Sequence, residues 1–260
     1  MDHQGRLRRA ALESGIPDDE VGRFTDHLRL SIRLSAGTRG AEPPAADDSS
    51  LPLVLSVDCA ALPRIDGFPL PAGGSLLFFL DHEKDHLAAA EGERKYARVT
   101  HVPEGSGLYE ATLLAELPDW LLTDDEDEDD DFTPFQEQLA HDLERDFPHL
   151  DELRALAVDL WPPSQGLARA YLGGYVDDEV MTSIAEQTLA GREKAGEIVI
   201  PVAKWYSHVE REKHRLAGEW LSLARFPLPG TYYTASFVIH YDDLAAGRWD
   251  RALSVTEFTE

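Results

Sequence analysis

One short segment carries the residue types and the spacing of a zinc-dependent hydrolase. His82-Glu83-Lys84-Asp85-His86 satisfies the pattern H-E-x-x-H, which on a helix directs two histidines to one metal ion and uses the glutamate as general base. The two central residues, however, are charged where such a helix is buried, and a predicted strand ends only two residues earlier. We therefore expect this segment to be a solvated turn, and a metal-dependent hydrolase is the alternative hypothesis.

Three arginines, Arg29, Arg33 and Arg39, lie close together in a chain that is otherwise rich in acidic residues. Arg29 and Arg33 share the outer face of a predicted strand, because side chains alternate along a strand. Such guanidinium groups are suited to bind an anion or an acidic peptide. We favour pairing with some of the 49 Asp and Glu side chains, since exposed arginines commonly pair in this way.

No other pattern in the sequence defines an active site. A G-x-S-x-G motif, a P-loop and a dinucleotide-binding glycine motif are all absent, and the acidic run at 123–131 lacks the glycine and glutamate spacing of an EF-hand loop. Cys59 is the one cysteine, which excludes an intrachain disulfide and a cysteine-based zinc cluster and fits a reducing, cytoplasmic compartment. We predict no catalytic residue, no cofactor and no metal outside the alternative given above.

Charge restricts the class of partner. The chain has 24 Lys and Arg against 49 Asp and Glu, a formal net charge of −25. Such a surface repels nucleic acid and anionic membranes, and no apolar run is long enough to span a membrane. The charge keeps the protein soluble, and in the sharper interpretation it lets an acidic face bind a basic protein partner.

The hydrophobic pattern of the first half predicts mainly strands after a short helical start. Leu7, Ala11 and Leu12 have helical spacing, and a second short helix is expected after Pro17. Alternation of apolar and polar residues predicts a half-buried strand at 28–34. The other predictions are a loop at 37–50, strands at 53–57, 76–80 and 96–102, and either a strand or a short helix at 109–117.

The second half is predicted to contain a helical insert followed by further strands. Thr133 and Pro134 form a helix start, and that helix ends at Pro148. The later predictions are helices at 150–160, 178–189 and 204–217, a turn at 172–175, and strands at 198–202 and 220–226.

Charge and composition also suggest where the chain divides. The acidic run is too charged to pack and is expected to be a solvated linker. The predicted parts are 1–36 (N-terminal helices and first strand), 37–122 (first strand-rich repeat), 123–132 (acidic linker) and 133–260 (helical insert and second repeat). We expect them to form one composite domain.

The same strand-rich unit occurs twice. In the first half, a strand at 76–80 precedes the turn Asp-His-Leu-Ala-Ala at 85–89; in the second, a strand at 236–239 precedes Asp-Asp-Leu-Ala-Ala at 242–246. An apolar strand introduces each copy, and a further strand follows each turn. This shared order indicates an internal duplication. The predicted fold class is therefore α+β, with mostly antiparallel sheets from an internally duplicated strand-rich unit and flanking helices.

Seven short matches follow one another in a fixed order, at 38–43, 51–58, 61–63, 74–79, 172–175, 220–223 and 243–246. In these segments the sequence resembles the YwqG-like family of bacterial domains of unknown function, over roughly residues 37–259. The resemblance implies an α+β fold with an internal duplication, no agreed activity, and an occurrence near bacterial toxin and immunity genes.

The chain departs from the family pattern at three single positions and at 227–230, where a Gly- and Asp-rich stretch of the family is reduced to Pro-Leu-Pro-Gly. An amide pair is usual in the family where Ser56 and Asp58 stand, and a proline is usual where Val176 follows Tyr175. Through the resemblance, Asp58 and Tyr175 become candidate partner- or ligand-binding residues, together with the three arginines described above.

These features predict an acidic protein-binding module. Its preferred form is an immunity- or antitoxin-like protein whose acidic surface covers a basic partner, on the basis of the net charge and the family resemblance. One alternative is the metal-dependent hydrolase that uses His82, Glu83 and His86. The other is a small-ligand binding protein with a pocket between the duplicated sheets.

Overall fold

The computed structural model describes residues 2–36, 51–85, 87, 95–103, 109–117, 145–162 and 168–258. Its helices are α1 (His3–Glu13), α2 (Asp18–His27), α5 (Leu150–Leu160), α6 (Asp178–Lys194), α7 (Trp205–Ala217) and α8 (Tyr241–Ala245). Its strands are β1 (Arg29–Ala36), β2 (Leu53–Asp58), β3 (Ser75–Leu80), β4 (Ala97–Val102), β5 (Tyr109–Glu116), β6 (Ala168–Gly173), β7 (Trp220–Pro227), β8 (Tyr233–His240) and β9 (Leu253–Phe258). Short 3-10 segments are η1 (Cys59–Ala61), η3 (Val202–Lys204) and η4 (Trp249–Arg251).

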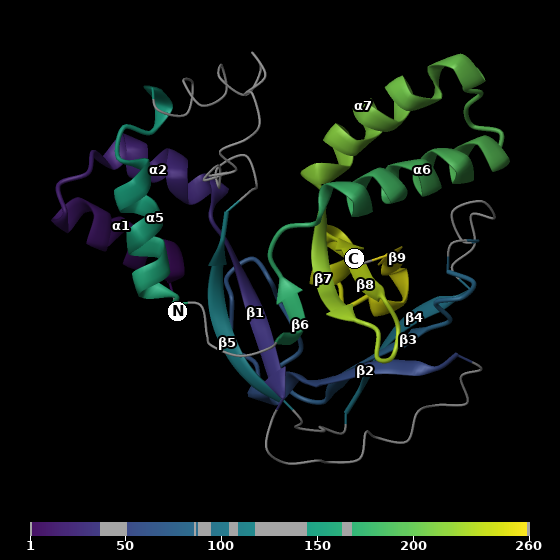
Figure 1. Cartoon of the computed structure of the whole chain (residues 1–260), viewed down its shortest axis with the longest axis horizontal. Helices are drawn as coiled ribbons and strands as arrows, with labels where there is room; N and C mark the ends of the chain where they lie inside the picture. The colour runs from purple at the N-terminus through teal and green to yellow at the C-terminus, as the bar shows by residue number, and fades with distance from the viewer. Residues whose placement is uncertain are drawn as a thin grey trace. The chain divides into compact units, whose positions relative to one another are not determined.

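Two antiparallel sheets with flanking helices make this an α+β fold, which confirms the predicted fold class (Figure 1). The larger sheet has the strand order β5-β1-β6-β7-β8-β9, and the smaller one has the order β2-β3-β4. None of the helices in the described part of the chain is both long and apolar enough to cross a membrane.

The chain divides into two compact units. The first comprises 1–31 and 113–165, and the second comprises 32–112 and 166–260. Each unit has a hydrophobic core of its own, one built from helices and the other from the paired strands and the α6–α7 hairpin.

In the first unit, α1, α2 and α5 pack around a common apolar core. Leu7 and Phe24 are fully buried there, and the Phe24 ring meets the Phe147 ring edge-on at a centroid distance of 6.4 Å. The buried Glu20 of α2 accepts hydrogen bonds from the backbone N–H of His149 (2.7 Å) and from its ring Nδ1 (2.9 Å). One carboxylate therefore holds the start of α5 against α2.

The second unit contains two three-stranded meanders of the same design, β2-β3-β4 and β7-β8-β9. In each meander the pairing of the first two strands skips one residue, between Leu53 and Leu55 in one copy and between Ser222 and Ala224 in the other. Directly after the skipped residue, Leu55 pairs with Phe78 and Ala224 pairs with Phe237. The bulge occupies the same place in both copies, as the duplicated unit predicts.

The equivalent phenylalanines of the two meanders contact each other. The rings of Phe78 and Phe237 are 5.1 Å apart, and Phe78 also meets Phe226 at 6.2 Å. On the other face of the second meander, apolar residues such as Val238 and Val255 pack with the buried residues of α6 and α7. The second meander is therefore covered on one face by the first meander and on the other by a helical hairpin (Figure 1).

Several predicted elements are corrected by the structure. Of the two alternatives for 109–117, the structure has the strand, β5, which ends at Glu116. The predicted strand at 198–202 is wrong, because 198–201 have no regular structure and Val202 begins the 3-10 turn η3. The turn predicted at 172–175 is preceded by a strand, β6, which ends at Gly173.

Some predictions fall on residues that the structure does not describe. These are the loop at 37–50, the acidic run at 123–131 and most of the helix expected between Pro134 and Pro148. The predicted parts 1–36, 37–122, 123–132 and 133–260 consequently stay predictions.

Candidate functional site

Of the three predicted arginines, Arg33 does not lie on the surface. This residue is 6% exposed, and its neighbours Ser31, Ile32 and Leu34 are also buried, so both faces of β1 are covered at this point. The expectation that Arg33 lies on an outer strand face is therefore wrong. Arg29 is half-buried at the start of β1, and Arg39 lies outside the described residues.

Asp58 and Tyr175 each lie where a strand ends. The Asp58 carboxylate accepts the backbone N–H of Ala60 at 2.9 Å and so caps the short helix η1. Tyr175 is half-buried in the connection from β6 to α6, directly after Gly173 and Gly174, whose φ angles are 77° and 79°. Asp58 therefore has a structural role, and a binding role for either residue stays a prediction.

The histidine motif is a turn in its described part. Residues 82–85 follow β3 in hydrogen-bonded turns, with the N–H of Lys84 donating to the carbonyl of Asp81 at 3.1 Å, and His86 lies outside the described residues. Among the residues that the structure describes, no group of three or more His, Cys, Asp and Glu side chains is arranged to hold a metal ion. The expected turn is confirmed for 82–85.

Asp85, however, is not solvated as expected. It is 3% exposed, and its carboxylate accepts hydrogen bonds from the hydroxyls of Ser254 (2.5 Å) and Thr256 (2.9 Å) on β9. These two hydroxyl donors therefore stabilise the buried carboxylate. This contact attaches the turn of the first meander to the last strand of the second.

Beside this turn, four aromatic side chains form what we call the aromatic strip: His82, Tyr232, Tyr233 and Phe258. The ring centroids of His82 and Tyr233 are 6.1 Å apart, those of Tyr233 and Phe258 are 5.7 Å apart, and those of Tyr232 and Phe258 are 6.3 Å apart. Tyr232 is 75% exposed and Phe258 is 63% exposed. The strip is therefore a chain of ring contacts that is open to solvent.

Strand register explains why these rings meet. Tyr233 and Phe258 are directly paired between β8 and β9, so both side chains lie on one face of the sheet. Phe237 belongs to the same face, because it is four positions from Tyr233 in β8, and this is the face that packs against the first meander. The strip is thus the exposed rim of the contact between the two meanders, and His82 is the contribution of the first.

Acidic residues adjoin the strip. Segment 81–85 holds three carboxylates and one lysine, and Lys84 is paired with Asp81 at 2.7 Å. Glu83 is exposed. The aromatic strip therefore lies beside residues with a negative balance, in keeping with the charge of the whole chain.

Glu257 precedes Phe258 in β9 but points to the opposite face, toward the start of α6. Its Oε1 atom is buried and has no hydrogen-bond partner in the described structure. Burial, followed by the charges of Asp177 and Glu179, raises the pKa of Glu257 to about 7, although Arg225 opposes this shift. Arg225 itself donates to both carboxylate oxygens of Asp177 at 2.6 Å.

The two meanders, the helical hairpin and the exposed strip define an α+β protein with a solvent-open aromatic surface. A scan against protein-family models finds no match, and no curated protein matches the chain. The resemblance to the YwqG-like family therefore stays a prediction.

The H-E-x-x-H pattern points to His82 and Glu83 as candidate metal-site residues, whereas no pattern in the sequence identifies the three other members of the strip. Tyr232 and Tyr233 follow a Pro-Gly turn, and Phe258 ends the last strand of the repeat. Alternation in the two strands places Tyr233 and Phe258 on definite faces, but their pairing depends on the register of β8 against β9. That register was the missing information.

Proposed function

We propose that the protein is a protein-binding module and that the aromatic strip binds a basic protein partner. The observation that carries this proposal is the exposed chain of ring contacts from His82 through Tyr233 and Phe258 to Tyr232. Aromatic side chains supply a large share of the binding free energy in protein interfaces, since they bury much area with few rotatable bonds.

Charge supports a basic partner over an acidic one. The exposed Glu83 directly follows His82 of the strip, and the net charge of −25 attracts a cationic protein from a distance. Lysine and arginine side chains can also contact the faces of exposed rings favourably. In its narrower form, the proposal is an immunity- or antitoxin-like cytoplasmic protein that covers a basic, nuclease-like partner.

Neither alternative function gains a supporting observation. Residues 82–85 form turns and not the helix that an H-E-x-x-H zinc site requires. The small-ligand hypothesis requires a pocket between the meanders. The rings of Phe78, Phe226 and Phe237 pack against one another in that contact.

The proposal is tested with the full chain as bait in extract from its own cells. Wild type, a Tyr232→Ala/Phe258→Ala variant and a Leu12→Ala/Val158→Ala control are compared, because Leu12 and Val158 are exposed apolar residues outside the strip. A basic protein that wild type and control retain and the strip variant loses is then purified. Calorimetry should give a Kd at least about tenfold weaker for the strip variant and a Kd that weakens as salt is added.

Two results would count against the proposal. One is that the strip variant and the Leu12→Ala/Val158→Ala control retain the same proteins. The other is an affinity for the purified partner that does not change with salt, since charge complementarity would then play no part.

A further inference from the structure

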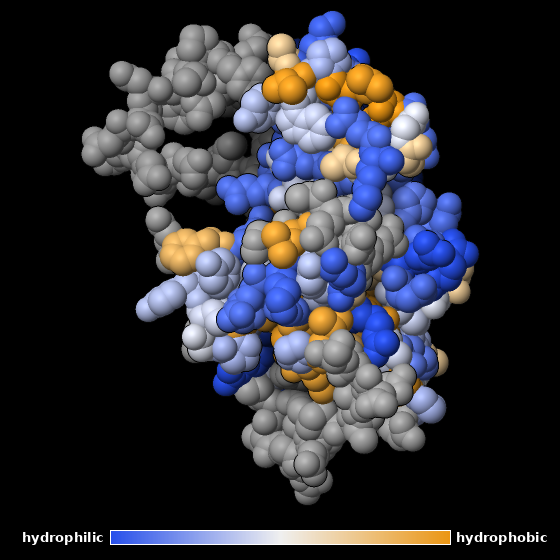
Figure 2. Space-filling view, turned by 90° about the vertical axis from the view of Figure 1, so that its right-hand side faces the viewer, coloured by the Kyte–Doolittle hydropathy of each residue, from blue (hydrophilic) through white to orange (hydrophobic). Residues whose placement is uncertain are grey.

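The connection between α6 and α7 exposes apolar side chains to an unusual degree. Val199 is 90% exposed and Val202 is 91% exposed, and Pro201, Ala203 and Tyr206 are exposed as well. We call these five residues the hairpin tip. Figure 2 shows hydrophobic side chains gathered near the top of the view, where the α6–α7 connection lies. Apolar surface that is gathered in this way commonly marks an interaction site.

Hydrogen bonds hold the tip in one conformation. After α6, Gly196 has a φ of 73°, and the N–H of Glu197 donates to the carbonyl of Arg192 at 3.0 Å. The N–H of Ile200 donates to the Glu193 carboxylate at 2.7 Å, and Ile200 itself is buried beneath the tip. The exposed valines are therefore presented by a fixed loop, so little entropy is lost when they become covered.

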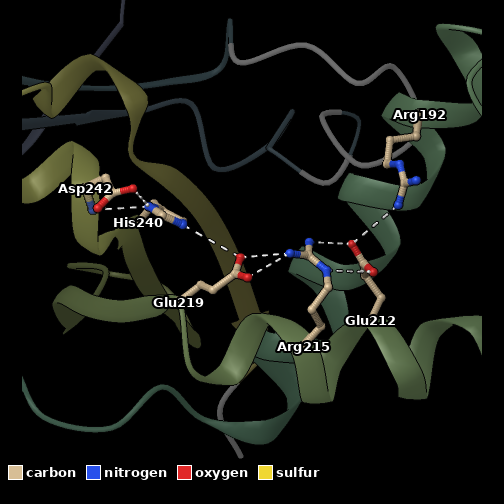
Figure 3. A network of polar contacts seen from close by, with 6 residues as sticks. All are labelled: Arg192, Glu212, Arg215, Glu219, His240 and Asp242. Atoms are coloured by element: carbon tan, nitrogen blue, oxygen red, sulfur yellow. Dashed lines mark hydrogen bonds and ion pairs between the residues drawn. The ribbon is translucent and has the colours of Figure 1, made fainter.

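A network of ion pairs joins α7 to the neighbouring elements (Figure 3). Arg215 donates to both oxygens of Glu212 (2.7 and 3.1 Å) and to both oxygens of Glu219 (2.9 and 2.8 Å). Glu212 also lies 3.9 Å from Arg192 of α6, and Glu219 lies 3.7 Å from His240 at the end of β8. These contacts connect α6, α7 and the second meander, and the tip projects from this framework.

The hairpin differs in charge from the rest of the chain. From the start of α6 to the end of α7, positions 178–217 hold six Lys and Arg against seven Asp and Glu, a net charge of −1. The other positions hold 18 against 42, a net charge of −24. Two copies of this protein repel each other over most of their surface, and the hairpin is where a second copy can approach with the least repulsion.

We propose that the hairpin tip binds a second copy of this chain, tip against tip, in a two-fold symmetric dimer. The two-fold arrangement pairs the apolar tip with itself and closes the assembly. A contact between the tip and a different surface of a second copy would instead be heterologous and would continue into open chains. The tip is separate from the aromatic strip, so dimerisation leaves the proposed partner site unaltered.

Analytical ultracentrifugation of the full chain over a range of concentrations and NaCl levels tests this proposal. The dimer fraction should rise with concentration and also with salt, because screening weakens the repulsion between two acidic chains. A Val199→Asp/Val202→Asp variant should weaken the dimer at least about tenfold, since each substitution occurs twice in the interface. Val199→Ser/Val202→Ser serves as a second variant that introduces no charge.

The strip variant Tyr232→Ala/Phe258→Ala is the matched control, and it should dimerise as wild type does. A protein that stays monomeric at every concentration and salt level overturns the proposal, as does a dimer that neither valine variant weakens. The affinity of the dimer should increase with salt, whereas the affinity of the strip for a basic partner should decrease with salt. The two proposals can therefore fail independently, and the measurements distinguish which one has failed.

Discussion

Asp85 and Glu257 show how differently two carboxylates can be accommodated in one unit. Asp85 accepts hydrogen bonds from two hydroxyls of β9, whereas the buried Oε1 of Glu257 has no partner in the described structure. Glu257 also faces the carboxylates of Asp177 and Glu179. Its ionised form is therefore unfavourable in the folded protein, and its pKa is raised from 4.5 to about 7.

This shift predicts a stability that falls as pH rises. The folded state binds the Glu257 proton more tightly than the unfolded state does, so the contribution of Glu257 to the free energy of unfolding decreases between the ordinary pKa of 4.5 and about 7 and then levels off. Glu257→Gln removes this titration. We expect the variant to match wild type near pH 4.5 and to be more stable by about 1–2 kcal/mol at pH 8, after allowance for solvent screening.

Thermal unfolding of both proteins across this pH range measures the difference, with Glu83→Gln as the control. That substitution removes the same charge from an exposed position. A difference between Glu257→Gln and wild type that is constant over the whole range would show that the amide acts through packing and not through ionisation.

At the scale of elements, the first meander depends on a glycine at the start of β3. Gly74 has a φ of 79°, and a Cβ atom placed there would lie 2.2 Å from the carbonyl oxygen of Val102. The carbonyl of Gly74 accepts the N–H of Cys59 at 2.9 Å, so this turn also connects to the end of β2. Any side chain at this position forces the ends of β3 and β4 apart.

Gly73 and Gly74 provide a matched pair of substitutions. Gly74→Ala should destabilise the protein by about 3 kcal/mol or more, because the alanine meets both a left-handed backbone conformation and a backbone oxygen. Gly73→Ala should change stability by less than about 1 kcal/mol, since no atom lies within 4 Å of its added Cβ. Urea unfolding measures both, and equal effects of the two substitutions would contradict this account of the turn.

The spacing of apolar residues predicted most of these helices and strands, because buried positions recur with the period of the helix or strand that they belong to. The alternation at 28–34 and the apolar run at 76–80 became β1 and β3. The pattern misled at 198–202, where five residues rich in valine and isoleucine form a connection without strand structure, with both valines exposed and Ile200 buried. Periodicity reports what a segment could bury, and it does not report whether a neighbouring strand is present to pair with it.

The aromatic strip was harder to predict than the fold for a related reason. Its members come from the turn after β3, the start of β8 and the end of β9, and these are far apart in the sequence. Likewise, Arg33 alternates with apolar residues as an exposed strand residue would, yet it is buried. Both features depend on how strands assemble, which single-sequence patterns leave open.

At the scale of the whole molecule, self-repulsion competes with ion pairing. The net charge of −25 disfavours the compact state, while pairs such as Arg8–Asp18 (2.6 Å) favour it. Both side chains of that pair are more than half exposed, and pairs of this kind contribute little in water. Salt screens both the repulsion among the acidic residues and the attraction within the exposed ion pairs. The repulsion should be the larger of these two effects.

This balance predicts that moderate salt stabilises the protein. Raising NaCl from about 0.01 to 0.15 M shortens the Debye length from about 30 to 8 Å, so most of the screening occurs in this range. We expect Tm to rise by roughly 3–6 °C there, with a smaller further rise at higher salt. The same measurement in sucrose is the control, because sucrose favours the compact state without screening charge. A Tm that falls over the low-salt range would show that the exposed ion pairs outweigh the repulsion. The acidic residues would then lie far enough from one another in the folded protein for their repulsion to be small.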